Sequence, residues 1–95
     1  MTYQLEFNDK ALKEWNKLDG SIRKKLAAKL KERRDNPRVP ADKLSEMDDC
    51  YKIKLRSDGY RLVYKVEDDK VVIAVISVAK RDKKLVYERA KKRLK

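Results

Sequence analysis

The chain has 95 residues, 45% of them charged and 41% hydrophobic, and 27 Lys and Arg against 16 Asp and Glu give a net charge of +11. The apolar residues fall into periodic runs, and Gly and Pro number only two each, which argues against a disordered tail. No apolar stretch has the length of a signal peptide or a transmembrane helix, so we expect a cytoplasmic protein with no membrane partner. The basic excess favours a polyanionic partner.

Cys50 is the single cysteine, and the chain contains no histidine. An internal disulfide is therefore excluded, and so are the common zinc-binding spacings, which leads us to expect no metal and no cofactor. Because Cys50 opens an apolar strand pattern, we expect it to be a small buried residue.

The N-terminal third is expected to hold one strand and two helices. Residues 2–7, "TYQLEF", alternate as a strand does, and Asn8 or Asp9 can cap a helix after it. "DGS" at 19–21 separates this helix from a second one, capped by Asp19 or Ser21, which Pro37 ends. The second helix carries an apolar stripe of Ile22, Leu26 and Leu30. Its remaining faces are basic, as a solvated surface or a phosphate-binding surface would be.

The rest of the chain is expected to add three strands and a last helix. Residues 36–49 form a connector pinned to the core by Leu44 and Met47, and a hairpin follows. The run from 70 to 79 is apolar at both parities, as in a central strand covered on both faces, after a turn at 67–69. Asp82 can cap the final helix, whose apolar side comprises Leu85, Val86, Ala90 and Leu94. The chain is therefore expected to be one domain, 1–95, of class α+β and order β-α-α-β-β-β-α, with a small, mainly antiparallel sheet packed by the helical hairpin.

The hairpin "CYKIKLRSDGYRLVYK" at 50–65 has one apolar and one basic face. Asp58-Gly59 predicts a two-residue turn, which pairs Arg56 with Arg61 and Lys52 with Lys65. The core face then consists of Ile53, Leu55, Leu62 and Tyr64. The other face consists of Lys52, Lys54, Arg56, Arg61 and Lys65, with Val63 as its apolar member. Because like charges opposite one another destabilise a sheet, this face is better explained as an anion-binding surface than as a solvated one.

Nucleic acid is the favoured anion, because a membrane-binding protein would present apolar side chains on a basic amphipathic helix. Tyr87 lies off the apolar side of the last helix and can stack on a base, whereas Tyr51, Tyr60 and Tyr64 have core parity. RNA cleavage by the 2′-OH requires a proton acceptor, charge stabilisation at phosphorus and a proton donor. A lysine within a cation cluster has a depressed pKa and suits proton transfer, so the composition permits this chemistry.

Three segments resemble the RelE family of bacterial toxin–antitoxin toxins over essentially the whole chain. They are "LKEWNKLDGSIRKKL", "CYKIKLRSDGYRLVYKV" and "VVIAVISVAKRDKKLVYERA". The resemblance implies a RelE-like, microbial-ribonuclease-like fold. It also implies a metal-independent endoribonuclease that cuts mRNA in the ribosomal A site, leaving a 2′,3′-cyclic phosphate and a 5′-OH.

The same resemblance implies a catalytic set of Lys52, Lys54, Arg61, Arg81 and Tyr87. Lys52 and Arg61 would stabilise the phosphorane, Lys54 and Arg81 would serve proton transfer and the leaving group, and Tyr87 would stack on the mRNA base. Further RNA contacts are expected from Arg56, Lys65, Lys80, Lys83, Lys91, Lys92 and Arg93.

The partners implied by the resemblance are the 70S ribosome with its 16S rRNA, mRNA, and a RelB-like antitoxin. Operator DNA would be bound only through the toxin–antitoxin complex. The alternative from another class is a non-catalytic nucleic-acid-binding component of a repressor complex, and a free ribonuclease is disfavoured by the missing His and Glu pair. Ser45-Glu46 and Asp48-Asp49 depart from the family pattern by adding acid to the connector.

Overall fold

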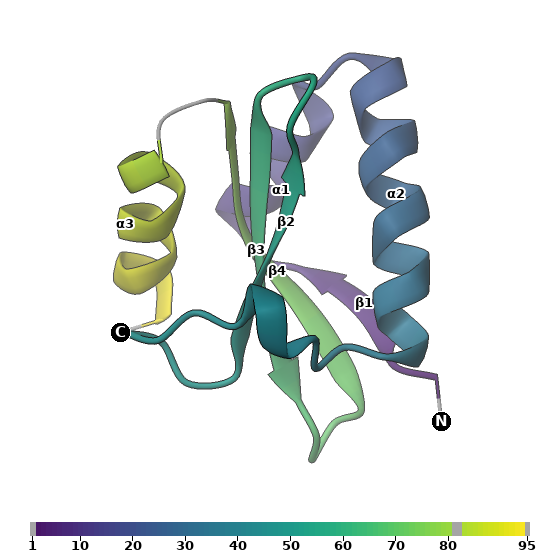
Figure 1. Cartoon of the computed structure of the whole chain (residues 1–95), viewed down its shortest axis with the longest axis vertical. Coiled ribbons are helices and arrows are strands. Elements are labelled where there is room, and N and C mark those ends of the chain that lie inside the picture. The colour runs from purple at the N-terminus through teal and green to yellow at the C-terminus, as the bar shows by residue number, and fades with distance from the viewer. Residues whose placement is uncertain (1, 81–82, 95) are drawn as a thin grey trace.

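The computed structural model describes residues 2–80 and 83–94, with the side chains of 83 and 84 excepted (Figure 1). The elements in chain order are β1 (Gln4–Phe7), α1 (Asp9–Asn16), α2 (Gly20–Asp35), the 3-10 turn η1 (Pro40–Asp42), β2 (Cys50–Leu55), β3 (Tyr60–Glu67), β4 (Val72–Lys80) and α3 (Lys83–Leu94). This order confirms the predicted α+β class. The short η1 turn inside the connector is an addition to the prediction.

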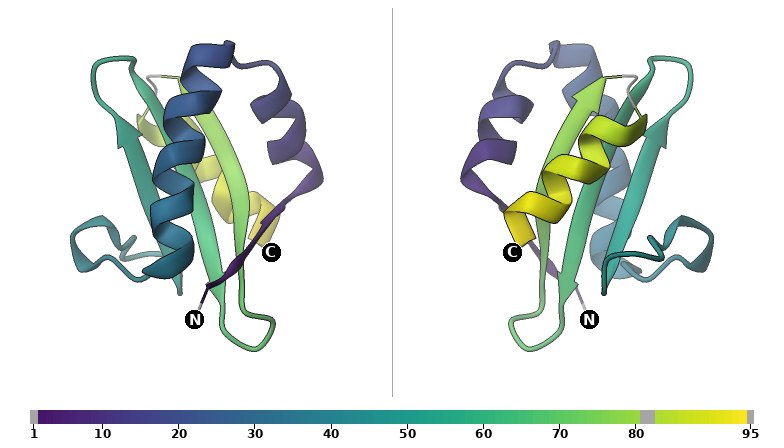
Figure 2. Two further views of the ribbon diagram at one scale, coloured as in Figure 1. Left: turned by 90° about the vertical axis from the view of Figure 1, so that its right-hand side faces the viewer. Right: turned by 90° about the vertical axis from the view of Figure 1, so that its left-hand side faces the viewer.

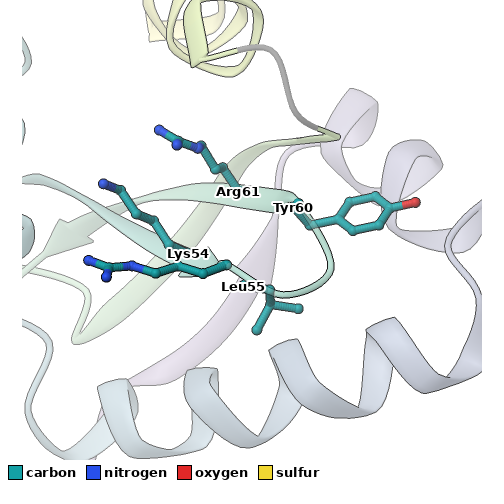
Figure 3. Close-up of a pocket in the computed structure, with 6 residues that line it drawn as sticks. Lys54, Leu55, Tyr60 and Arg61 are labelled. Carbon is teal, nitrogen blue, oxygen red and sulfur yellow. The ribbon is translucent and has the colours of Figure 1, made fainter.

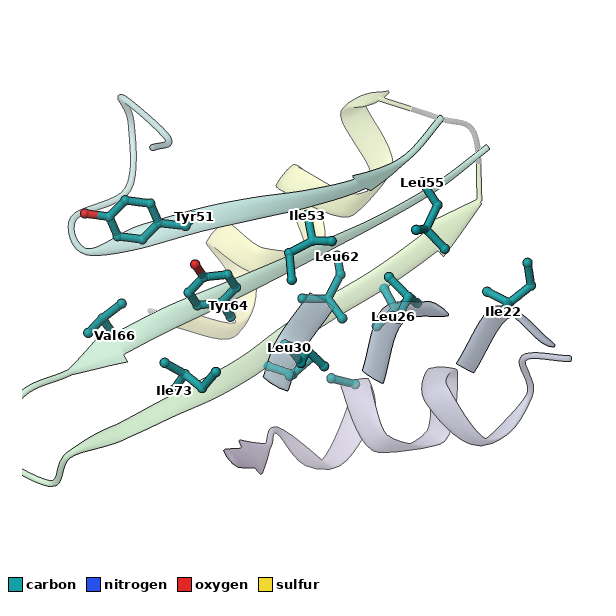
Figure 4. Close-up of a cluster of buried hydrophobic side chains, with 13 residues drawn as sticks. Ile22, Leu26, Leu30, Tyr51, Ile53, Leu55, Leu62, Tyr64, Val66 and Ile73 are labelled. Carbon is teal, nitrogen blue, oxygen red and sulfur yellow. The ribbon is translucent and has the colours of Figure 1, made fainter. Parts of the chain in front are cut away.

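The sheet has the order β1-β4-β3-β2, with β1 parallel to β4 and the other pairs antiparallel. Helices α1 and α2 lie on one side of it and α3 on the other (Figures 1 and 2). We call the apolar cluster beneath α1 and α2 the first core and the cluster beneath α3 the second core. The first core is the larger, and Figure 4 shows its sheet residues facing Leu26 and Leu30 of α2.

Local sequence signals account for the helix boundaries. The Asn8 side chain caps α1 by accepting from the backbone N–H groups of Lys10 and Ala11, at 3.0 and 3.4 Å. Asp19 occupies the N-cap of α2 without a side-chain hydrogen bond, and α2 ends at Asp35, two residues before a proline. The predicted cap of the last helix, Asp82, lies outside the described residues.

Strand β4 is central, as predicted, because β1 and β3 flank it and its side chains enter both cores. It begins at Val72 rather than at residue 70, and Glu67 still belongs to β3. The turn between these strands therefore lies later than predicted, and within it Val71 has a φ of 54°. A β-branched residue rarely adopts a positive φ, so the sequence gives no reason to expect the turn at this position.

The hairpin register differs from the prediction by two residues. Lys54 lies opposite Arg61 and Lys52 opposite Val63, so the predicted pairs of Arg56 with Arg61 and of Lys52 with Lys65 are wrong. The connection is a four-residue loop, 56–59, closed by Gly59 N–H donating to the Leu55 carbonyl at 2.8 Å. Only the glycine of the Asp58-Gly59 pair has positive φ, 72°, whereas a two-residue turn needs it at both positions. A shift of two residues keeps every side chain on its predicted face.

Candidate active site on the basic face of the hairpin

The basic face of the β2–β3 hairpin brings Lys52, Lys54 and Arg61 together. Lys52 and Lys54 are alternate residues of β2, and Arg61 is the direct cross-strand partner of Lys54. A shallow pocket of about 320 Å³ lies beside Lys54 and Arg61 at the tip of the hairpin. Figure 3 shows the side chains of Lys54 and Arg61 extending to one side of the hairpin, while Leu55 points the opposite way. The hairpin therefore places three cations next to one another on one face of the sheet.

Crowding of these cations changes the chemistry of Lys54. The charge of Lys52 is the largest cause that lowers the pKa of Lys54, and desolvation and the charge of Arg61 lower it further. Each neighbouring positive charge disfavours protonation of the next amine. The ammonium of Lys54 therefore releases its proton more readily than that of an isolated lysine.

Tyr87 reaches this face from α3. Its helix is docked by Val86 and Ala90, which are fully buried in the second core, and the Ser77 hydroxyl donates to the Val86 carbonyl at 2.7 Å. The Arg61 guanidinium donates to the Tyr87 hydroxyl at 3.5 Å, which links α3 to the hairpin cations. Tyr87 is half-buried, because it also packs against the second core. It therefore lies closer to the apolar side of α3 than predicted.

Val63, the apolar exception on the basic face, is explained by the same helix. It is fully buried in the second core together with Val86 and Ala90. The basic face is consequently divided: α3 covers its middle, and the cations at the hairpin tip stay accessible.

Arg33 supports the hairpin from α2 and was not identified from the sequence. Its guanidinium donates to the Lys52 carbonyl at 3.3 Å, the Tyr64 hydroxyl at 3.0 Å and the Asp42 carboxylate at 2.6 Å. The signal in the sequence is its position three residues after Leu30, which extends the apolar stripe of α2 by one turn. A basic residue at the end of such a stripe faces the sheet rather than solvent.

The predicted RNA-binding residues of the sheet do not share one location. Arg56 is exposed and lines the tip pocket with Lys54. Lys65 lies opposite Cys50, and it lines a different pocket that includes the connector residue Glu46. Lys80 lies on the other side of the sheet, with its ammonium 5.8 Å from the centre of the Tyr60 ring.

The predicted RNA-binding residues of α3 also separate. Lys91 is paired with the connector residue Glu46, and Lys92 is exposed. Arg93 differs from the prediction, because its side chain is only 10% exposed and its guanidinium is bonded to Glu14 of α1. The Arg81 residue and the Lys83 side chain lie outside what the structure describes. The acid that the connector adds at Glu46 thus contacts α3.

Cys50 is buried, as predicted, and burial raises the pKa of its thiol to about 11. Among the described residues no group of three or more His, Cys, Asp or Glu side chains is placed to hold a metal ion. The helices of the described ranges are all too short or too polar to cross a membrane.

Comparison with known proteins identifies relatives over the full chain. The profile of a family described as "ParE toxin of type II toxin-antitoxin system, parDE" matches residues 5–85. The chain is 56% identical over 94 residues to the mRNA interferase toxin RelE of Escherichia coli K12, covering 99% of each protein.

Two solved structures extend this similarity to the fold. A doubly substituted E. coli toxin RelE in the free state matches with a TM-score of 0.92 and 55% identity, covering 100% of both chains. The toxin in the crystal structure of the intact E. coli RelBE toxin–antitoxin complex matches with a TM-score of 0.82 and 57% identity, covering 85% of this chain and 99% of that one.

Proposed function

Since this chain belongs to the RelE-type toxins of type II toxin–antitoxin systems, we propose that it is an endoribonuclease that cuts mRNA in the ribosomal A site and so inhibits translation. The observation that carries the proposal is the placement of Lys52, Lys54 and Arg61 on one face of the hairpin, with Tyr87 of α3 bonded to Arg61. A surface that only binds phosphate has no need of a tyrosine held beside its cations.

The reaction begins when the 2′-OH loses its proton and its oxygen attacks the adjacent phosphorus. The P–O5′ bond then breaks, the 5′ oxygen takes up a proton, and the products are a 2′,3′-cyclic phosphate and a 5′-OH. Forming these two ends consumes no water molecule and requires no metal ion or redox partner. The chain has only to move two protons and to stabilise the extra negative charge of the phosphorane.

The described side chains suit these tasks differently. Lys52 and Arg61 contribute positive charge at the phosphorane, and an arginine contributes two parallel hydrogen bonds to phosphate oxygens. Lys54, with its lowered pKa, serves proton transfer. Arg81 is assigned to the leaving group by resemblance to the family, and Tyr87 stacks on the base beside the scissile bond.

The proposed partners follow from the same family membership. The 70S ribosome presents the mRNA, and basic residues outside the catalytic set, such as the exposed Arg56 and Lys92, contact 16S rRNA. A RelB-like antitoxin neutralises the toxin, as the RelBE complex of the E. coli relative suggests. The two proteins together bind operator DNA and repress their operon. All of these partners place the protein in the cytoplasm.

The test is cleavage of a defined mRNA by the purified chain with and without programmed 70S ribosomes. Cleavage that requires ribosomes and leaves a 2′,3′-cyclic end supports the proposal. Binding without cleavage in either case would refute it and favour the repressor component.

Two arginines of the same face give a matched comparison within the site. Arg61→Ala is expected to lower kcat, because it removes charge at the phosphorane, whereas Arg56→Ala is expected to raise KM with little change in kcat. Arg81→Ala and Tyr87→Ala are expected to abolish cleavage while circular dichroism shows a retained fold. Unimpaired cleavage by both of these variants would contradict the assignment of the site.

A further inference from the structure

The edge of β4 beyond the end of β1 is covered by side chains instead of a strand. Strand β1 pairs with Val72–Val75, and the last backbone bond on this edge is Asn8 N–H to the Val75 carbonyl at 2.9 Å. Further along, the Ile76 carbonyl accepts from Arg93 at 2.8 Å, and the Val78 N–H donates to Glu14 at 3.1 Å. One carboxylate and one guanidinium thus satisfy backbone groups that an open edge would leave exposed.

The same carboxylate holds α3. Both Glu14 oxygens accept from the Arg93 guanidinium, at 2.8 and 3.1 Å, and Arg89 donates to one of them at 2.5 Å. The Glu14 side chain is 18% exposed and that of Arg93 only 10%, so their ion pair is poorly screened by solvent. Burial alone would raise the pKa of Glu14, but hydrogen bonds from Arg93 and the Val78 N–H hold it below its usual value.

Other described contacts of α3 are the bond from Ser77 to its backbone, the pairing of Lys91 with Glu46, and packing against the second core. Within the second core its fully buried residues are Val86 and Ala90, while Leu85 and Leu94 are only partly buried. Tyr87 is two residues before Arg89 and six before Arg93, which places it about 9 Å along the helix axis from the second arginine. Because a helix of three turns moves as a stiff rod, loosening its C-terminal half displaces Tyr87 as well.

A structural role limited to edge protection would not require this arrangement. The backbone N–H of Asn8 already bonds the Val75 carbonyl, so an uncharged group can satisfy this edge of β4. Removing two or three charges from water is costly, and an apolar contact of similar size would dock a helix with a smaller penalty. What the charges add is direction, because a guanidinium bonded to both oxygens of a carboxylate fixes the angle between the two groups.

We propose that Glu14 is a positioning residue of the active site: by binding Arg93 and Arg89 it sets the orientation of α3 and thereby the place of Tyr87 beside Arg61. The inference rests on the proposed function for its effect on cleavage. Its effect on the position of Tyr87 is independent of that function and is measured separately.

The first measurement follows Tyr87 itself in the absence of ribosomes. The full chain is labelled with 3-fluorotyrosine, and Tyr87→Phe identifies the ¹⁹F signal of Tyr87. Glu14→Gln is expected to move that signal toward its position in the urea-unfolded chain while the other four tyrosine signals stay in place. Glu88→Gln, which removes an exposed carboxylate of α3 itself, is expected to move none of them.

Two outcomes of the fluorine experiment would overturn the proposal. An unchanged Tyr87 signal in Glu14→Gln would mean that the ion pair does not orient the helix. A joint shift of all five signals would mean that Glu14 stabilises the whole fold and has no specific connection with Tyr87.

The second measurement compares cleavage on programmed ribosomes by Glu14→Gln and by the control variant Glu88→Gln. Loss of hydrogen bonds to a charged group corresponds to a factor of about ten in an equilibrium, so Glu14→Gln is expected to lower kcat about tenfold, with KM changed by less than about twofold. Glu88→Gln is expected to change kcat by less than about twofold. An unchanged kcat in Glu14→Gln, or an equal loss in both variants, would overturn the proposal. If the unsubstituted chain does not cut at all, the proposed function fails, and the fluorine signals still decide the role of Glu14.

Discussion

Helix α3 is expected to detach from the sheet more easily than the rest of the fold unravels, and Val86→Ala tests this directly. Val86 has no exposed surface, and it packs with Val63 and Ala90 in the second core. The substitution removes two buried methyl groups from the helix that carries Tyr87, and it leaves the first core intact. We therefore expect its main effect on the docking of α3.

The magnitude follows from the burial of Val86. Two methyl groups contribute about 1.6 kcal/mol of transfer free energy, and the cavity left behind brings the expected loss to about 2–3 kcal/mol. A loss of about 2 kcal/mol corresponds to roughly a 30-fold shift in the docking equilibrium of α3. Among the described side chains of α3, Val86 and Ala90 are the fully buried ones, so such a loss is a large part of what docks the helix.

The assay combines two probes on opposite sides of the sheet. Hydrogen exchange of the α3 amides is expected to become about 30-fold faster in Val86→Ala. The fluorescence of Trp15 reports on the first core, where its ring centre lies 5.2 Å from that of Phe7. Its urea midpoint is expected to stay unchanged, because α3 has already detached at lower urea concentration.

Val75→Ala is the matched control, since Val75 is equally buried but belongs to the first core. It is expected to lower the Trp15 midpoint while leaving the exchange of α3 almost unaffected in the absence of urea. If Val86→Ala lowers the Trp15 midpoint as much as Val75→Ala does, α3 unfolds together with the sheet. The idea of a separately docked helix would then be refuted.

Charge and burial lead to expected results at three other positions. Lys52→Met removes the largest cause of the lowered pKa of Lys54, so that pKa rises, and the pH at which cleavage reaches its plateau is expected to move upward. Cys50 has a thiol pKa raised to about 11, so at pH 8 it stays protonated and is expected to resist iodoacetamide until urea unfolds the chain. Arg33→Met leaves a partly buried carboxylate without its partner and is expected to cost about 1.5–3 kcal/mol in urea unfolding.

One exposed lysine of α2 provides the control for two of these results. Lys24→Met removes an exposed charge of α2 and is expected to leave both the pH profile and the unfolding midpoint in place. A pH profile unchanged by Lys52→Met would count against Lys54 in proton transfer. Rapid alkylation of Cys50 in the folded chain would contradict its burial, and an unaltered midpoint in Arg33→Met would show that its three hydrogen bonds add nothing to stability.

The hairpin shows which part of the site is readable from sequence. Alternation of apolar and basic residues assigns Lys52, Lys54 and Arg61 to one face. A shift of the register by two residues leaves this assignment unchanged. The partner of each residue depends on the loop, and Asp58-Gly59 suits either a two-residue or a four-residue loop. The observed loop places Lys54 opposite Arg61, where the predicted register had Arg56.

Long-range ion pairs explain the other differences. Arg93 and Lys91 stand among the basic residues of an apparently solvated helix end, and nothing local distinguishes them from Lys92. Their carboxylate partners, Glu14 and Glu46, lie 79 and 45 residues away in the chain. Such pairs form only when distant segments have packed together, so the residue pattern within one element cannot predict them.

The amino-acid sequence by itself therefore determined the order of elements, the two faces of the hairpin and the inward stripe of α2, because these depend on patterns that repeat within one element. Only the tertiary structure decided which cations meet, and which are bound by carboxylates. It brought Tyr87 to Arg61 by docking α3 over Val63, and it placed Glu14 at the open edge of β4. The physical reason is that a side chain's charge is visible in the sequence, whereas its neighbours depend on packing between segments far apart in the chain.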